Sequence, residues 1–156
     1  MTTDISLDLD EQISISIPSV FGYEEVITEA VGSIAKIKKF PLEKTSKLKL
    51  AVAEACINAI EHGNNKDASK KVMVTITSQE NLISASIHDQ GCNQIEPDHK
   101  MTDLGKQIQD KQIGGWGLFL IEKLVDSVEV ESDPGRFTKT TLTVNRNDDN
   151  SDSTSQ

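Results

Sequence analysis

The chain has 156 residues, a formal net charge of −9 and an apolar fraction of 36%. This length predicts one domain with its own core. The acidic balance argues against direct nucleic-acid binding, because phosphate backbones are bound mainly by clustered Lys and Arg. The sequence has no apolar run of bilayer length and no basic-then-apolar leader, so we expect a cytoplasmic protein without membrane contact.

The first part of the chain predicts a strand followed by two helices. Residues 12–17 alternate Ile with polar residues, which is the period of a strand with one buried face. Residues 20–40 carry apolar side chains at helical spacing, which predicts an amphipathic helix. Its expected inward positions are Val20, Val26, Ile27, Ala30, Val31, Ile34 and Ile37. A second, largely apolar helix is predicted over residues 43–62 and ended by Gly63.

The later part of the chain predicts two β-hairpins separated by a third helix. Residues 72–77 and 82–88 both alternate with period two, and the short polar stretch between them indicates a hairpin turn. Residues 117–125 are apolar at helical spacing. Residues 127–131 and 137–145 predict a closing hairpin whose turn contains Pro and Gly.

Three segments show no regular period. Residues 92–113 are largely polar and contain Pro and Gly, and a connection of this length in a compact domain is commonly a functional lid. Residues 147–156 contain only Asn, Asp, Ser, Thr and Gln, so we expect a disordered tail. Residues 1–11 are expected to be flexible, which leaves a single domain over residues 12–146.

Basic residues gather where the first predicted helix ends and the second begins. They are Lys36, Lys38, Lys39, Lys44, Lys47 and Lys49. Such a cluster is either a solvated face or a docking patch for an acidic partner, and the sequence leaves both interpretations open. Cys56 lies among apolar residues of the second helix, which predicts a core residue rather than a nucleophile.

Two polar residues interrupt the apolar second helix. Glu54 and Asn58 lie one turn apart and therefore share a face. An amide oxygen at Asn58 suits Mg²⁺ together with water and phosphate oxygens, and a carboxylate at Glu54 suits a general base for phosphoryl transfer. The alternative is that the two side chains only hydrogen-bond inside the domain. His62, two turns after Glu54, either reaches the same face or complements the helix dipole.

Two further motifs suit a nucleotide. Asp89 and Gly91 end a predicted strand, where a carboxylate can accept the exocyclic amine of adenine; the alternative is a simple strand-ending turn. Gly114, Gly115 and Gly117 precede the third helix, and glycines at a helix N-terminus expose N–H groups to an anion. The alternative there is a hinge for the preceding loop.

The order of these motifs resembles the N, G1 and G2 boxes of the GHKL ATPase superfamily. More narrowly, the segments around Asn58 and Gly117 look like the bacterial anti-sigma factor serine/threonine kinases of the RsbW and SpoIIAB type. The resemblance covers roughly residues 13–144. Two positions depart from it, since Asn93 and Lys139 stand where members of this family often carry glycine.

The resemblance implies an α+β Bergerat fold, a two-layer sandwich with a mixed, mostly antiparallel sheet and helices on one face. It implies ATP and Mg²⁺ as ligands, with Asn58 on the metal, Glu54 as general base and Asp89 as the adenine reader. Thr140 or Thr141 would complete the adenine contacts. The pocket would also involve Gly91, Gly114, Gly115, Gly117 and Leu118.

The same resemblance implies a function. An ATP-loaded protein of this kind sequesters a sigma factor and phosphorylates a Ser or Thr of a STAS-type anti-sigma factor antagonist. A homodimer is compatible with the resemblance. Two alternatives remain open at this point: a non-catalytic, ATP-gated binding module, and a partner-switching kinase that controls a process other than transcription.

Overall fold

The computed structural model describes residues 11–91 and 114–148, and its strands form one sheet in the order β1-β2-β3-β5-β4. Every pairing in this described sheet is antiparallel. The strands are β1 (Glu11–Pro18), β2 (Lys71–Ser78), β3 (Leu82–His88), β4 (Ser127–Asp133) and β5 (Phe137–Asn145). The helices are α1 (Glu24–Ile37), α2 (Leu42–Asn58), the π-helix η1 (Ala59–Gly63) and α4 (Gly114–Leu124).

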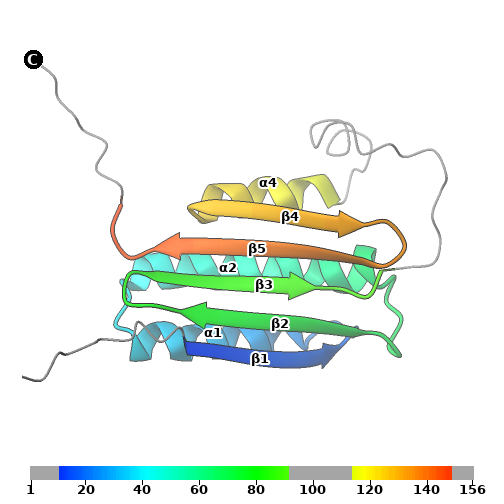
Figure 1. Ribbon diagram of the computed structural model, residues 1–156, viewed down its shortest axis with the longest axis horizontal. Helices are drawn as coiled ribbons and strands as arrows, with labels where there is room; N and C mark the ends of the chain where they lie inside the picture. Colours follow the sequence, from blue (N-terminus) through cyan, green and yellow to red (C-terminus); the bar gives the residue numbers. More distant parts are fainter. Residues whose placement is uncertain (1–10, 92–113, 149–156) are drawn as a thin grey trace, which may run out of the picture.

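The helices cover one face of the sheet, which gives two layers (Figure 1). This arrangement confirms the expected α+β class with a mostly antiparallel sheet. Glu11 is already part of β1, so the first strand begins one residue earlier than expected. The predicted lid at residues 92–113, residues 1–10 and residues 149–156 lie outside the described residues.

The core lies between the two layers because the strands alternate apolar and polar side chains. In β2, Val72, Val74 and Ile76 are buried toward the helices. The opposite face is rich in hydroxyl groups, which hydrogen-bond across strands from Ser14 to Thr75 at 3.2 Å and from Ser86 to Thr141 at 2.9 Å. The helices complete the core with Ile27, Val31, Ile34, Leu48, Val52, Cys56 and Ile121, among others.

Fewer apolar helix residues are buried than the sequence predicts. Val20 and Val26 are exposed, and Ile37 at the end of α1 is 72% exposed. In α2, Leu50 is 47% exposed although the residues around it are mostly apolar. Each helix packs on the sheet with one stripe, so the apolar residues off that stripe stay at the surface.

The turn between α1 and α2 is tied to the far end of the sheet by one arginine. The Arg146 guanidinium donates hydrogen bonds to the carbonyl oxygens of Lys38, Lys39 and Glu80, and it stacks 4.4 Å from the Phe40 ring centroid. Lys39 has a positive φ of 56°, which is rare for a residue with a side chain. The arginine therefore stabilises a tight connection between the two helices.

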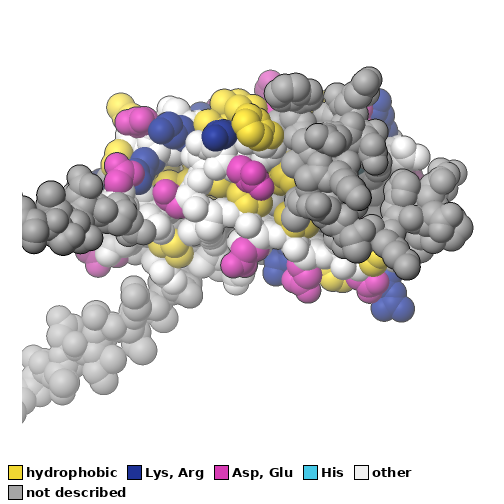
Figure 2. Space-filling view, turned by 90° about the horizontal axis from the view of Figure 1, so that it is seen from above, with side chains coloured by type: hydrophobic (Ala, Val, Ile, Leu, Met, Phe, Trp, Pro, Cys, Tyr) yellow, Lys and Arg dark blue, Asp and Glu magenta, His cyan; other side chains and the backbone are white. Residues whose placement is uncertain are grey.

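The surface reflects the acidic composition. Figure 2 shows Asp and Glu side chains interspersed with hydrophobic ones on the side formed by α4 and β4. Phe119, Leu120 and Val130 are among the exposed hydrophobic residues of these two elements. None of the described helices is both long and apolar enough to cross a membrane.

Candidate functional site

A cavity of about 290 Å³ opens between the helices and the ends of β3 and β5. This volume is near the lower end of the range for small-molecule pockets. The lining residues come from α2 and η1, β3, α4 and β5: Ala55, Asn58, Ala59, His62, Gly63, Ile87, Asp89, Leu118, Ile121, Thr138 and Thr140. Four of the residues predicted from sequence motifs therefore line the same cavity: Asn58, Asp89, Leu118 and Thr140.

Asp89 is the buried carboxylate of this cavity. It directly follows β3 and is only 4% exposed. Its Oδ1 accepts hydrogen bonds from the backbone N–H groups of Gly91 and Thr138, both at 2.9 Å. Burial raises the pKa of the Asp89 carboxyl above its ordinary value, and the two N–H groups offset part of that rise because they stabilise the ionised form. Both described hydrogen bonds use Oδ1, so Oδ2 is the oxygen available to a donor on a ligand.

The end of the long helix brings the backbone against this carboxylate. Asn58 ends α2, and the chain continues into one turn of π-helix in which the Asn64 N–H donates to the Ala59 carbonyl at 2.8 Å. Single π-turns are frequent at functional sites. A Cβ atom added to Gly63 would lie 2.1 Å from the Asp89 Oδ2. The backbone at Gly63 therefore forms one wall of the cavity directly beside the carboxylate.

Asn64 connects three segments around this wall, a role that no motif in the sequence indicates. It is fully buried. Its Nδ2 donates to the Ser19 Oγ at 2.8 Å and to the Lys71 carbonyl at 3.0 Å, while its Oδ1 accepts from the Gln90 N–H at 2.8 Å. Because Gln90 follows Asp89 directly, Asn64 holds the strand end that carries the carboxylate. An Asn after a helix-ending Gly is typical of a turn, so its position gives no sequence signal for this role.

Glu54 and Asn58 meet Gly117 of α4 beside the cavity. A Cβ atom on Gly117 would lie 3.0 Å from Asn58 Nδ2, 3.2 Å from Asn58 Oδ1 and 3.4 Å from Glu54 Oε2. The helix spacing therefore does place the carboxylate and the amide together, next to α4. Asn58 lines the cavity itself, whereas Glu54 lies one turn back and is not among the lining residues.

The remaining glycines lie at turns and at a helix start. Gly114 and Gly115 are the first two residues of α4, so the helix begins three residues earlier than predicted and includes all three glycines. The first N–H groups of a helix have no partner within it, so they remain available to an anion. Gly91 has a φ of +68°, and a Cβ there would lie 2.9 Å from the Arg136 carbonyl carbon. Only glycine fits this turn without strain.

On the last strand, only one of the two predicted threonines lines the cavity. Thr140 lines the cavity, whereas Thr141 lies on the opposite face and hydrogen-bonds Ser86. Thr138, two residues before Thr140, also lines the cavity and was missed; its N–H is one of the two donors to Asp89. Lys139 alternates with these residues, so its side chain projects from the far face and leaves the cavity unobstructed.

Outside this cavity, the Cys56 thiol has a defined protonation state. Cys56 is fully buried in the core, and burial raises the pKa of its thiol to about 12, with a smaller contribution from the charge of Glu24. The thiol is therefore protonated and inert at neutral pH, as the sequence predicted. Within residues 11–91 and 114–148, no group of three or more His, Cys, Asp or Glu side chains is arranged to hold a metal.

Comparison with protein families decides the relationship of this chain. Residues 22–145 match the family model of the histidine kinase-like ATPase domain. The chain belongs to this family. The match spans the segments that supply Asn58, Asp89 and Gly117 to the site, and it confirms the GHKL-type resemblance of the motifs.

Relatives within this histidine kinase-like ATPase family carry the name serine-protein kinase RsbW. The protein of Bacillus velezensis is 30% identical over 130 residues, covering 80% of this chain and 81% of the relative. The protein of Halalkalibacterium halodurans is 31% identical over 130 residues, covering 80% and 78%. The protein of Bacillus subtilis is 28% identical over 130 residues, covering 80% and 81%. These matches confirm the narrower resemblance to RsbW-type proteins.

Solved structures share the fold of this family member. The RsbU and RsbW domains of a Mycobacterium tuberculosis protein match with a TM-score of 0.62 at 18% identity, covering 86% of this chain and 32% of that chain. The SiaB–SiaC complex of Pseudomonas aeruginosa matches with a TM-score of 0.57 at 13% identity, covering 85% of this chain and 88% of that chain. At such identities the likeness shows the fold alone.

Proposed function

We propose that this protein is an ATP-dependent serine/threonine protein kinase of the RsbW type that also acts as an anti-sigma factor. The observation that carries the proposal is the position of Glu54 and Asn58 against Gly117, beside a cavity whose other side holds the buried Asp89. A nucleotide bound in this cavity would have its base at Asp89 and its phosphates at the start of α4. Membership of the ATPase family and relatives named serine-protein kinase support this assignment.

The residues at the base end suit adenine. An exocyclic amine donates hydrogen bonds, and the Asp89 Oδ2 is the acceptor that the cavity offers to it. Guanine presents a carbonyl oxygen at the corresponding position, so an ionised Asp89 would repel it. Thr138 and Thr140 add hydroxyl groups on the same wall of the cavity. These hydrogen-bonding groups therefore fit ATP better than GTP.

The residues at the phosphate end suit phosphoryl transfer. ATP bound with Mg²⁺ would supply the transferable phosphoryl group and an electrophilic phosphorus. The Asn58 Oδ1 would serve as a ligand of the metal, in keeping with the preference of Mg²⁺ for few protein oxygens beside water and phosphate. The N–H groups at the start of α4 would stabilise phosphate charge. Glu54 would accept the proton of the attacking Ser or Thr hydroxyl as the new O–P bond forms and ADP departs.

The protein substrate and the other partners follow from the same family relationship. We propose a STAS-type antagonist as the phosphorylated partner, a sigma factor as the sequestered one and the cytoplasm as the location; a homodimer is compatible with the same relationship. One solved structure that shares this fold is the SiaB–SiaC complex of Pseudomonas aeruginosa, which supports a partner-binding role for the fold.

A non-catalytic, ATP-gated binding module is the alternative function, and control of a process other than transcription is a variant of the main one. Glu54 favours the kinase. A module that only bound ATP would need Asn58 and Asp89 but no carboxylate next to the phosphate end. The position of Glu54 Oε2 beside Gly117 is thus the feature that distinguishes the two.

The proposal is tested by phosphate transfer from Mg-ATP to a purified STAS-type antagonist, with mass spectrometry of the product. We expect Glu54→Gln to slow transfer by about 10²- to 10⁴-fold while ATP affinity stays unchanged. Glu61→Gln is the matched control, since Glu61 lies on η1 and pairs with Lys66 at 3.8 Å rather than facing Gly117. Undiminished transfer by Glu54→Gln would remove the base role. Tight ATP binding without any transfer by the unmodified chain would favour the binding module.

A further inference from the structure

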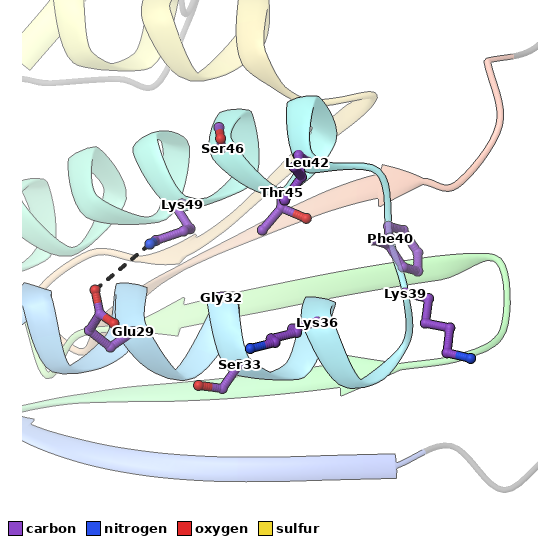
Figure 3. A pocket seen from close by; sticks show the side chains of 10 residues that line it. All are labelled: Glu29, Gly32, Ser33, Lys36, Lys39, Phe40, Leu42, Thr45, Ser46 and Lys49. Atoms are coloured by element: carbon purple, nitrogen blue, oxygen red, sulfur yellow. Dashed lines mark ion pairs between the residues drawn. The ribbon is translucent and has the colours of Figure 1, made fainter.

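A second and larger cavity lies on the outer side of the helical layer. It is a groove of about 690 Å³ between α1 and α2, and Figure 3 shows its walls from close by. Its lining repeats at i, i+3, i+4 and i+7 on both helices, so each helix presents one continuous face to it. The lining residues are Glu29, Gly32, Ser33, Lys36, Lys39, Phe40, Leu42, Thr45, Ser46 and Lys49. The groove shares no described residue with the cavity that holds Asp89.

The groove is basic although the protein is acidic. Lys36, Lys39 and Lys49 line it against a single glutamate, in a chain whose net charge is −9. Glu29 pairs with Lys49 at 3.7 Å, as Figure 3 shows, and both side chains remain solvent-accessible. Lys36 and Lys39 form no ion pair with any residue in the described part of the chain. The groove thus attracts a negatively charged ligand where most of the surface repels one.

Hydrophobic side chains accompany these lysines. Leu42 lines the groove and is 84% exposed. Ile37 lies four residues after Ser33, and Leu50 lies four residues after Ser46, so both extend the lining faces of their helices. Ile37 and Leu50 are exposed as well. A partner that covered the groove would gain apolar burial together with charge pairing.

The shape of the groove is built into the packing of the two helices. Gly32 lies in the middle of α1, and a Cβ there would meet the Lys49 Cδ at 3.3 Å. The absence of a side chain at this position lets the Lys49 stem cross toward Glu29. At the turn that joins α1 to α2, the hydrogen bonds from Arg146 hold the carbonyl groups of Lys38 and Lys39 in place. The lysines therefore project from a fixed framework rather than from a loose turn.

We propose that this groove binds an acidic, amphipathic helix of a partner protein. Two parallel rows of side chains on neighbouring helices match the surface of a third helix laid between them, in the way that amphipathic helices dock into grooves. Acidic residues on that helix pair with Lys36, Lys39 and Lys49, and its apolar residues cover Leu42. This docking surface is separate from the nucleotide cavity and goes beyond the kinase reaction.

The test is a fluorescence anisotropy titration with a labelled helical model peptide of alternating Glu and Leu rows. A second peptide with every Glu replaced by Gln is the control ligand. We expect the acidic peptide to bind the full chain, and to lose roughly tenfold in affinity between low and high salt, because screening weakens exposed charge pairs. Binding should persist in saturating Mg-ATP. Displacement by Mg-ATP, or equal binding of the Gln peptide, would overturn the proposal.

Variants of the chain test whether the acidic peptide binds in the groove. The triple change Lys36→Gln, Lys39→Gln and Lys49→Gln should lower the affinity for the acidic peptide at least tenfold. The change Leu42→Ser should lower that affinity several-fold. The matched control removes three lysines outside the groove, by Lys71→Gln, Lys123→Gln and Lys139→Gln, and should leave affinity within twofold. Equal losses in both triple variants would show a bulk charge effect and contradict a defined groove. Circular dichroism confirms that each variant is folded.

Discussion

Gly63 and Asp89 are in direct contact: the position that a Cβ of residue 63 would take is 2.1 Å from the Asp89 Oδ2 and 2.8 Å from the Asp89 Cβ. Gly63 is not in the left-handed region of backbone conformation, so its dihedral angles alone do not require glycine. The requirement comes from the carboxylate, which occupies the space of a side chain. The end of the π-helix and the end of β3 are thereby fitted to each other around the Asp89 Oδ2, the oxygen that we propose contacts adenine.

The first prediction is that Gly63→Ala moves the carboxylate. The added methyl group cannot be accommodated by rotation of a flexible side chain, because the Asp89 Cβ is also too close. We expect the free energy of unfolding to fall by about 1–3 kcal/mol, as for other overpacked sites. ATP affinity should fall at least tenfold. Calorimetric titration and denaturant unfolding measure the two effects.

Gly32→Ala is the control for this change, since Gly32 also lies in a helix but faces only the flexible stem of Lys49. Alanine is favoured over glycine in a helix interior by up to about 1 kcal/mol. We therefore expect equal or greater stability with unchanged ATP affinity. An ATP affinity for Gly63→Ala that matched this control would show that Asp89 can move freely.

The second prediction concerns pH. The pKa of Asp89 is raised by burial, so the folded protein holds its proton more tightly than the unfolded chain does. The stability from this group is present below the unfolded pKa and is lost as pH rises through the folded pKa. The ionised form is the one that accepts the adenine amine. Affinity should therefore decline as pH falls through the folded pKa, at a higher pH than an exposed aspartate would give.

Adenosine is the suitable ligand for this experiment because it has no phosphate to titrate. Asp89→Asn should bind adenosine weakly and should lose the part of the pH dependence that the aspartate causes. Identical pH profiles for the two proteins would contradict an adenine contact at Asp89.

The third prediction concerns Asn64. Asn64→Ala leaves the Gln90 N–H and the Lys71 carbonyl without their Asn64 partner in a partly buried setting. Such losses cost about 1–3 kcal/mol. Because Gln90 adjoins Asp89, the ratio of the affinity for ATP to the affinity for GTP should fall as well. Asn81→Ala, at the exposed turn between β2 and β3, should change stability by about 0.5 kcal/mol or less. Full ATP selectivity in Asn64→Ala would limit Asn64 to a stabilising role.

Much of the fold is predictable because its elements have strong periods. The alternation of residues 72–77 and 82–88 gives the central hairpin, and the Glu54 to Asn58 spacing puts both side chains on one face. The extent of burial was less predictable, since Leu50 and Ile37 fit a helical period but fall off the stripe that meets the sheet. Period alone does not fix which stripe that is.

Contacts between distant segments were the part that the sequence did not give. The choice of Thr140 over Thr141 depends on strand register, which pairs Ile87 with Thr140. Thr138 reaches the cavity because the same register sets it opposite Asp89. Asn64 acts through Ser19, Lys71 and Gln90, none of which is a helix neighbour. Such roles become visible only when the chain is folded.

We propose that Asp89 and Asn58 belong to one ATP site, with the base at Asp89 and the Mg²⁺-bound phosphates at Asn58. Calorimetric titration of the purified chain with ATP and GTP, each with and without Mg²⁺, tests it most directly, with Asp89→Asn and Asn58→Ala alongside. We expect tight binding of ATP only, strengthened by Mg²⁺, with base selectivity lost in Asp89→Asn and magnesium dependence lost in Asn58→Ala. Equal binding of ATP and GTP, or binding that neither variant alters, would contradict the account.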